Sequence, residues 1–221
     1  MRDGDFEDFV SDFGEATTRI QASSSDIEKW RGRLPDRLLS WWSEEGWSGY
    51  ADGLFWLVNP SDYEDIVEEW LGDTELGGQD KFHVVARTAF GVLYASGESM
   101  GCDVVISCPR NSIFAGKFKT NSKEQLDVDI RSFLAVGDKE KYDFKDRWRV
   151  PLFDRALKSL GSLASDEMYG FEPALVLGGE RKLENLRKVK LDQHLTILRQ
   201  FGDPDFPFKN IDFDAIIKSH Q

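Results

Sequence analysis

The sequence has 221 residues, of which 40% are hydrophobic and 31% are charged, so a disordered or fibrous chain is excluded. Its 40 acidic and 28 basic residues give a net charge of −12. This balance excludes a general binder of nucleic acid or of anionic membranes, because such proteins present a basic face. The two cysteines, Cys102 and Cys108, lack the spacing and the neighbouring histidines of a zinc site.

The N-terminus and the apolar runs bear on cellular location. The first residues, MRDGDFEDFVSDFGEA, are acidic and contain no apolar core of a signal peptide. The longest apolar runs fall far short of the roughly 18 residues that a membrane-spanning helix needs. We therefore expect a cytoplasmic protein without a membrane partner.

Residues 1–71 carry a mainly helical pattern. Phe6, Phe9, Val10 and Phe13 recur at helical spacing and predict a first helix over about 4–15, followed by a small polar loop over 16–25. Capping residues, Pro35 and Gly46 then delimit further elements. These are a short helix from Ser25 or Asp26 to Trp30, a helix over 35–46, a buried strand over 54–58 and an acidic helix over 60–71.

The pattern changes after the glycine-rich loop 72–81. Short β-type runs separated by turn residues predict an antiparallel meander over 82–90, 91–97, 102–108 and 112–117. A helix is predicted up to Gly137, and the remainder predicts a helix over 151–160, a strand over 169–179 and a helix over 191–202. We therefore predict an α+β fold of antiparallel sheets with helices packed on one side. It would form two adjoining α+β units, residues 1–118 and 119–221.

Charge and tryptophan are unevenly distributed along the chain. Residues 1–76 contain 19 acids and six bases, a net charge of −13, whereas residues 77–221 have a net charge of +1. Six of the seven tryptophans lie in the same first third. Acids beside large aromatic side chains suit a protein–protein contact, because the aromatics anchor a partner and the charges steer a basic one. A solvated helix face explains any single acid equally well.

The predicted contact surface is therefore drawn from the acids and aromatics of residues 36–76. Its members are Trp41, Glu44, Glu45, Trp47, Tyr50, Asp52, Tyr63, Glu64, Asp65, Glu68 and Glu69. Trp42, Trp56 and Trp70 are assigned to the core.

Catalytic and metal-binding patterns are missing from the sequence. The three histidines, His83, His194 and His220, form no HExxH pair, and no GxSxG, GxxxxGK[ST] or GxGxxG motif occurs. The acid runs also lack the spacing of a calcium loop. We predict no catalytic residues, no metal site and no cofactor.

Two stretches resemble known domains. Residues 34–71 read LPDRLLSWWSEEGWSGYADGLFWLVNPSDYEDIVEEWL, which combines a tryptophan-rich helix, a Phe-Trp strand and an Asn-Pro start to an acidic helix. This stretch resembles the GAD-like domain. Residues 167–202 read EMYGFEPALVLGGERKLENLRKVKLDQHLTILRQFG, and they resemble the small domain commonly found C-terminal to GAD-like domains.

This pairing is similar to bacterial immunity proteins that neutralise DNase effectors of type VI secretion systems. It implies a non-catalytic antitoxin that binds a cognate toxin, a basic nuclease whose cleft the acids would cover. No particular oligomeric state is implied. Two alternatives stay open: a regulatory module that uses its acidic face on another basic protein, and an enzyme with His194, Asp192 and Glu167 as nominal candidates.

Overall fold

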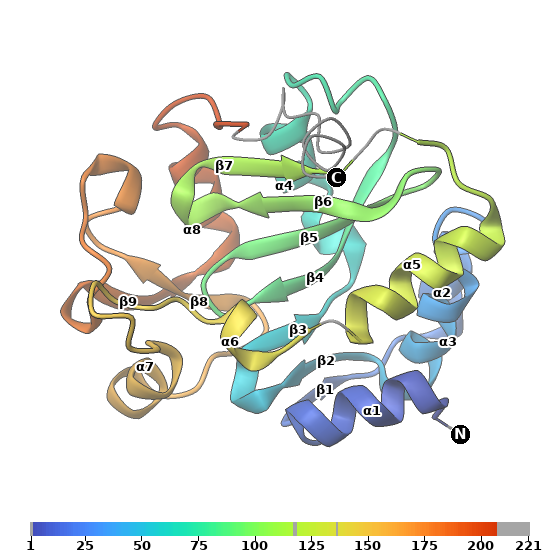
Figure 1. The fold of residues 1–221 in the computed structure, drawn as a ribbon, viewed down its shortest axis with the longest axis horizontal. Coiled ribbons are helices and arrows are strands. Elements are labelled where there is room, and N and C mark those ends of the chain that lie inside the picture. The colour runs from blue at the N-terminus through green and yellow to red at the C-terminus, as the bar shows by residue number, and fades with distance from the viewer. Residues whose placement is uncertain (1, 117–118, 136, 207–221) are drawn as a thin grey trace, which may run out of the picture.

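The centre of the protein is an antiparallel sheet of seven strands, seen in a computed structural model that describes residues 2–116, 119–135 and 137–206 (Figure 1). The strands lie side by side in chain order: β1 (Thr18–Ile20), β2 (Trp47–Tyr50), β3 (Phe55–Leu57), β4 (Phe82–Thr88), β5 (Val92–Gly97), β6 (Gly101–Ser107) and β7 (Ser112–Ala115). A separate antiparallel pair is formed by β8 (Glu167–Phe171) and β9 (Leu186–Lys190). The predicted α+β class is confirmed.

The helices of the described residues surround this sheet (Figure 1). The α-helices are α1 (Gly4–Phe13), α2 (Ser24–Trp30), α3 (Asp36–Glu45), α4 (Glu64–Leu71), α5 (Lys123–Ala135), α6 (Lys139–Tyr142), α7 (Phe153–Leu160) and α8 (Leu191–Arg199). Single 3-10 turns are η1 (Ala51–Gly53), η2 (Pro60–Tyr63), η3 (Cys108–Arg110), η4 (Leu175–Leu177) and η5 (Leu183–Asn185). The helix predicted over 60–71 is thus divided into η2 and α4.

Helix α1 forms where the sequence predicts it, because its cap and its apolar stripe agree. The Asp3 carboxylate accepts a hydrogen bond from the Phe6 backbone N–H at 2.9 Å and caps the first turn. Phe6, Phe9 and Phe13 are buried, and the Phe9 ring lies 5.6 Å from that of Phe55 on β3. The helix therefore covers the face of the sheet that carries Phe55.

Helices cover both faces of the sheet, whereas the sequence predicted helices on one side only. Phe133 of α5 contacts Phe55 on the same face as α1. The neighbouring residue Trp56 points to the opposite face, which α4 and α8 cover (Figure 1). The physical reason is that β4 and β5 are buried at every residue, so neither face can be left to solvent.

Three strands, β1, β2 and β9, escape the sequence pattern. Residues predicted as a polar loop contain β1, in which Thr18 pairs with Gly49 and Ile20 pairs with Trp47. Strand β9 is mostly charged and pairs with β8 along its whole length. In addition, the strand predicted over 169–179 ends at Phe171, since Pro173 has no N–H with which to continue a ladder.

The C-terminal elements pack directly onto the N-terminal ones. Helix α5 contacts α1 and α3, and α8 contacts α4. Gly91 lies in the turn between β4 and β5 with a φ of +76°, and a Cβ there would come within 2.6 Å of Met168 Cε and 3.0 Å of Leu195 Cδ2. Glycine thus permits β8 and α8 to approach this turn. The unit boundary predicted at 118 adjoins residues 117–118, which lie outside the described part, and stays a prediction.

Candidate partner-binding surface

The aromatic residues predicted to anchor a partner are core residues. Trp41, Tyr50 and Tyr63 are 3%, 0% and 4% exposed, and Trp47 is 7% exposed. The Trp41 indole N–H donates to the Asp3 carboxylate at 2.9 Å, and its ring lies 5.6 Å from that of Phe6. None of these four side chains therefore projects from the surface to anchor a partner in this structure.

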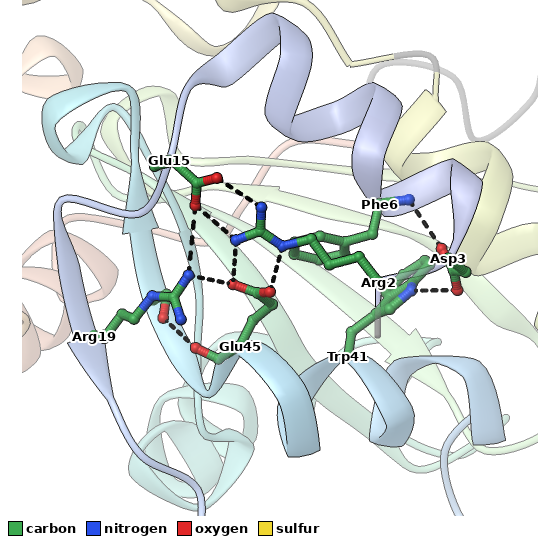
Figure 2. Close-up of polar contacts among 8 residues, drawn as sticks. Arg2, Asp3, Phe6, Glu15, Arg19, Trp41 and Glu45 are labelled. Carbon is green, nitrogen blue, oxygen red and sulfur yellow. Dashed lines mark hydrogen bonds and ion pairs between the residues drawn. The ribbon is translucent and has the colours of Figure 1, made fainter.

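Glu45 is also a structural residue rather than a surface acid. It is 6% exposed, and its carboxylate forms ion pairs with the guanidinium groups of Arg2, at 2.5 Å, and Arg19, at 2.7 Å. Figure 2 shows Arg2 lying between Glu45 and Glu15, and its guanidinium group lies 2.6 Å from the Glu15 carboxylate. Burial requires such partners for a carboxylate, and here the ion pairs join α3, β1 and the start of the chain.

The remaining six predicted contact residues are exposed. They are Glu44, Asp52, Glu64, Asp65, Glu68 and Glu69. Helix α4 presents the last four on its outer surface, while Ile66, Trp70 and Leu71 face the core. Glu64 is paired with Lys29 of α2 at 2.9 Å, and this hydrogen bond holds the pKa of Glu64 below its ordinary value. The structure therefore brings together the acids of α4.

Asp52 belongs to a different part of the surface. It lies in η1 at a hollow of about 440 Å³, which Glu15, Glu140 and Asp143 also line. Burial is the main cause that raises the pKa of Asp143 to about 6. Acids of this hollow come from residues far apart in sequence, so composition alone does not reveal the group.

One exposed aromatic has no role in the sequence pattern. Trp148 is 66% exposed and lies in a tight loop, residues 146–150, called here the Trp148 loop. The buried Asp146 carboxylate accepts hydrogen bonds from the backbone N–H groups of Trp148 and Val150, both at 3.0 Å, and is paired with Arg155 at 2.8 Å. The Arg147 guanidinium lies 4.0 Å from the centre of the Trp148 ring.

The surroundings of the Trp148 loop are basic and apolar. Arg147 interacts electrostatically with Glu180. The next residue in the chain, Arg181, repels the positive charge of Arg110. Leu177, on the same connection as Glu180, is 60% exposed. The sign of charge here is opposite to that of α4. This loop was not predicted from the sequence, and the only sequence feature that marks it is a lone tryptophan within the charged segment 138–149.

Two of the three nominal catalytic residues are engaged in packing or local hydrogen bonds, and the third, Asp192, is exposed at the start of α8. His194 packs against Gly170, and burial lowers the pKa of its imidazole. Glu167 accepts a hydrogen bond from the Ala164 backbone N–H at 2.9 Å. Among residues 2–116, 119–135 and 137–206, no cluster of three or more His, Cys, Asp or Glu side chains is arranged to hold a metal ion. Within those ranges no helix is long and apolar enough to span a membrane.

Comparison with solved structures finds similarity over most of the chain. The crystal structure of Atu4351 from Agrobacterium tumefaciens is 27% identical in sequence and superposes with a TM-score of 0.77. The match covers 89% of this chain and 89% of the other. No curated protein matches the chain.

Family models match two successive parts of the chain. The GAD-like domain matches residues 5–110, and the C-terminal domain of the T6SS immunity protein Tdi1 matches residues 127–202. The first range holds the seven-stranded sheet up to β6 with α1 to α4, and the second holds most of α5 and all of β8, β9 and α8. The chain therefore belongs to the proteins in which a GAD-like domain is followed by the C-terminal domain of the Tdi1 type VI secretion immunity proteins.

Proposed function

We propose that this protein is a non-catalytic immunity protein that binds a cognate type VI secretion effector, a DNase, and neutralises it. The observation that carries the proposal is the succession of the GAD-like domain and the Tdi1 C-terminal domain in one chain. A DNase acts on DNA in the cytoplasm, so the immunity protein is proposed to act there too.

The exposed acids of α4 support a basic partner. Glu64, Asp65, Glu68 and Glu69 lie on eight residues of one helix whose opposite side is buried. An enzyme that holds the DNA backbone presents a basic cleft, and carboxylates on a rigid helix complement it. Steering by these charges would speed association, which an antitoxin needs in order to act before the genome is cut. Glu44 and Asp52 remain in the proposed contact surface.

The test begins with the genes that flank the one encoding this protein. Each neighbouring product is expressed in a host that lacks the whole locus, with and without this protein, and growth and genomic DNA are followed. We expect one neighbour to degrade DNA and stop growth, and co-expression of this protein to restore both. The purified pair should form a complex in which cleavage of plasmid DNA is suppressed.

One variant and the behaviour of the neighbouring gene products separate the alternatives. Protection that persists in His194→Ala would support a binding role, whereas an enzyme that relies on this histidine would lose its effect. If no neighbouring product is toxic and none is inhibited, a regulatory module without a toxin replaces the immunity function.

A further inference from the structure

A pocket of about 350 Å³ opens where the two family domains meet. Its walls include Trp47, Trp56 and Tyr63 from the GAD-like domain and Leu191 from the Tdi1-type domain. These walls are largely apolar and aromatic. Trp47 and Tyr63 are too buried to project toward a partner. Their rings instead form part of the pocket wall, against which a partner side chain could pack.

Three exposed carboxylates line the same pocket, and they also come from both domains. They belong to Asp62 in η2, to Asp166 just before β8 and to Asp192 in the first turn of α8. Partial burial and, second, the negative charge of the nearby Asp26 raise the pKa of Asp62 above its ordinary value.

The positive charges nearby compensate only part of this group. Lys190 pairs with Asp166 at 2.6 Å. Arg87 lies beneath the wall, with its guanidinium 4.7 Å from the centre of the Trp56 ring, and it donates to the Ser165 carbonyl oxygen at 2.8 Å. Lys190 also interacts electrostatically with Asp192, so one lysine serves both of these carboxylates. Asp62 adds a third carboxylate, and the mouth of the pocket therefore carries net negative charge.

We infer that this pocket receives a lysine or arginine side chain of the effector, an inference that rests on the proposed function. Long basic side chains combine an apolar stem with a charged head, so the aromatic walls suit the stem and the carboxylates suit the head.

The position of the pocket would let one effector side chain contact both domains. An effector side chain seated there contacts η2 of the first domain and the start of α8 of the second at once. The acids of α4 follow η2 directly in the chain, so the pocket and the acidic helix are neighbouring parts of one contact region.

The first experiment blocks the pocket without disturbing the core. Ser165 lines the pocket and is exposed, so Ser165→Trp places an indole at the entrance. Ser162→Trp is the matched control, because Ser162 is exposed on the same connection and is not a lining residue. With the effector from the neighbouring gene as the probe, we expect Ser165→Trp to weaken affinity at least about 30-fold, as for the loss of a central anchor, and Ser162→Trp to change it less than threefold.

The second experiment removes charge alone. Asp62→Asn with Asp192→Asn should weaken effector binding about tenfold or more at low salt, and less at high salt. Glu7→Gln with Asp8→Asn on α1 makes the same change in net charge away from the pocket and should have a smaller effect. In a scan of the effector's exposed lysines and arginines, substitution of one should be non-additive with Asp62→Asn.

The outcomes separate the pocket from the wider function. If wild type binds and neutralises the effector and Ser165→Trp does so equally well, the pocket is not occupied and the inference is overturned while the immunity function stands. If wild type binds no product of a neighbouring gene, the proposed function and the inference fail together. Selective loss in Ser165→Trp, with its folded circular dichroism spectrum retained, supports both.

Discussion

Residues 1–76 and the Trp148 loop differ in whether their tryptophans are buried or exposed. Residues 1–76 contain six, each at most 7% exposed, and present acids to solvent. The remaining tryptophan, Trp148, is 66% exposed among arginines. Acids and aromatics that are neighbours in sequence therefore need not share a surface. In the first region aromatics build the core and a pocket wall while acids lie outside, and in the second an aromatic itself reaches solvent.

An arginine that links the first region to the C-terminal part of the chain, through Trp56 and Ser165, should show the largest effect on stability. Arg87 is 0% exposed, donates to the Ser165 carbonyl oxygen and is covered by the Trp56 ring. Arg87→Met should lower the free energy of unfolding by about 2–4 kcal/mol, because Ser165 and Tyr63 lose a buried hydrogen-bond donor. Urea denaturation measures the change. Arg31→Met is the control, since Arg31 forms an exposed pair with Glu28. Equal stability of both variants would show that Arg87 does not tie these two parts together.

The next largest effect on stability is expected at Glu45, because this acidic residue of the first region is buried. Glu45→Gln should lower the free energy of unfolding by about 1.5–3 kcal/mol, since hydrogen bonds to a charged group are lost at Arg2 and Arg19. Glu69→Gln on exposed α4 should change stability by less than about 0.5 kcal/mol. A similar small change in both would mean that buried and exposed acids of this region are equivalent.

The acids on α4 should affect association rather than stability. Glu64→Lys, Glu68→Lys and Glu69→Lys together should slow association with the effector about tenfold or more at low salt, and the difference should shrink as salt is added. Stopped-flow fluorescence at several salt concentrations measures the rate. A triple reversal on α1, Glu7→Lys, Asp8→Lys and Asp12→Lys, matches the change in net charge. Equal slowing by both triples would assign the effect to net charge and not to α4.

The sequence predicts those elements whose own residues carry a cap or an apolar stripe. Helices α1 and α3 carry apolar stripes bounded by a cap or by a proline and a glycine, and they form where predicted. Strand β1 has no such signal, since its three residues are partly or fully exposed and are held by pairing with β2. Pairing between distant segments leaves no periodic pattern in either of them.

The exposure of the proposed contact residues was predictable only where a single helix carries them. The α4 acids alternate with buried residues in a single helix, so their exposure follows from the period of the helix. The pocket instead combines η2 with Ser165 and Asp192, which lie more than 100 residues away in sequence. Likewise, nothing local distinguishes the buried Glu45 from its exposed neighbour Glu44, because burial comes from Arg2 and Arg19.

The smallest effect is expected at the most exposed tryptophan. Trp148→Ala should change the free energy of unfolding by less than about 0.5 kcal/mol, since the loop is held by backbone hydrogen bonds to Asp146 that the variant keeps. Effector affinity should also stay within about threefold, because Arg147 and the nearby Arg181 repel a basic cleft. Titration calorimetry of both proteins measures this. A loss above tenfold with stability unchanged would place the effector on the basic surface and reverse the roles assigned to the two regions.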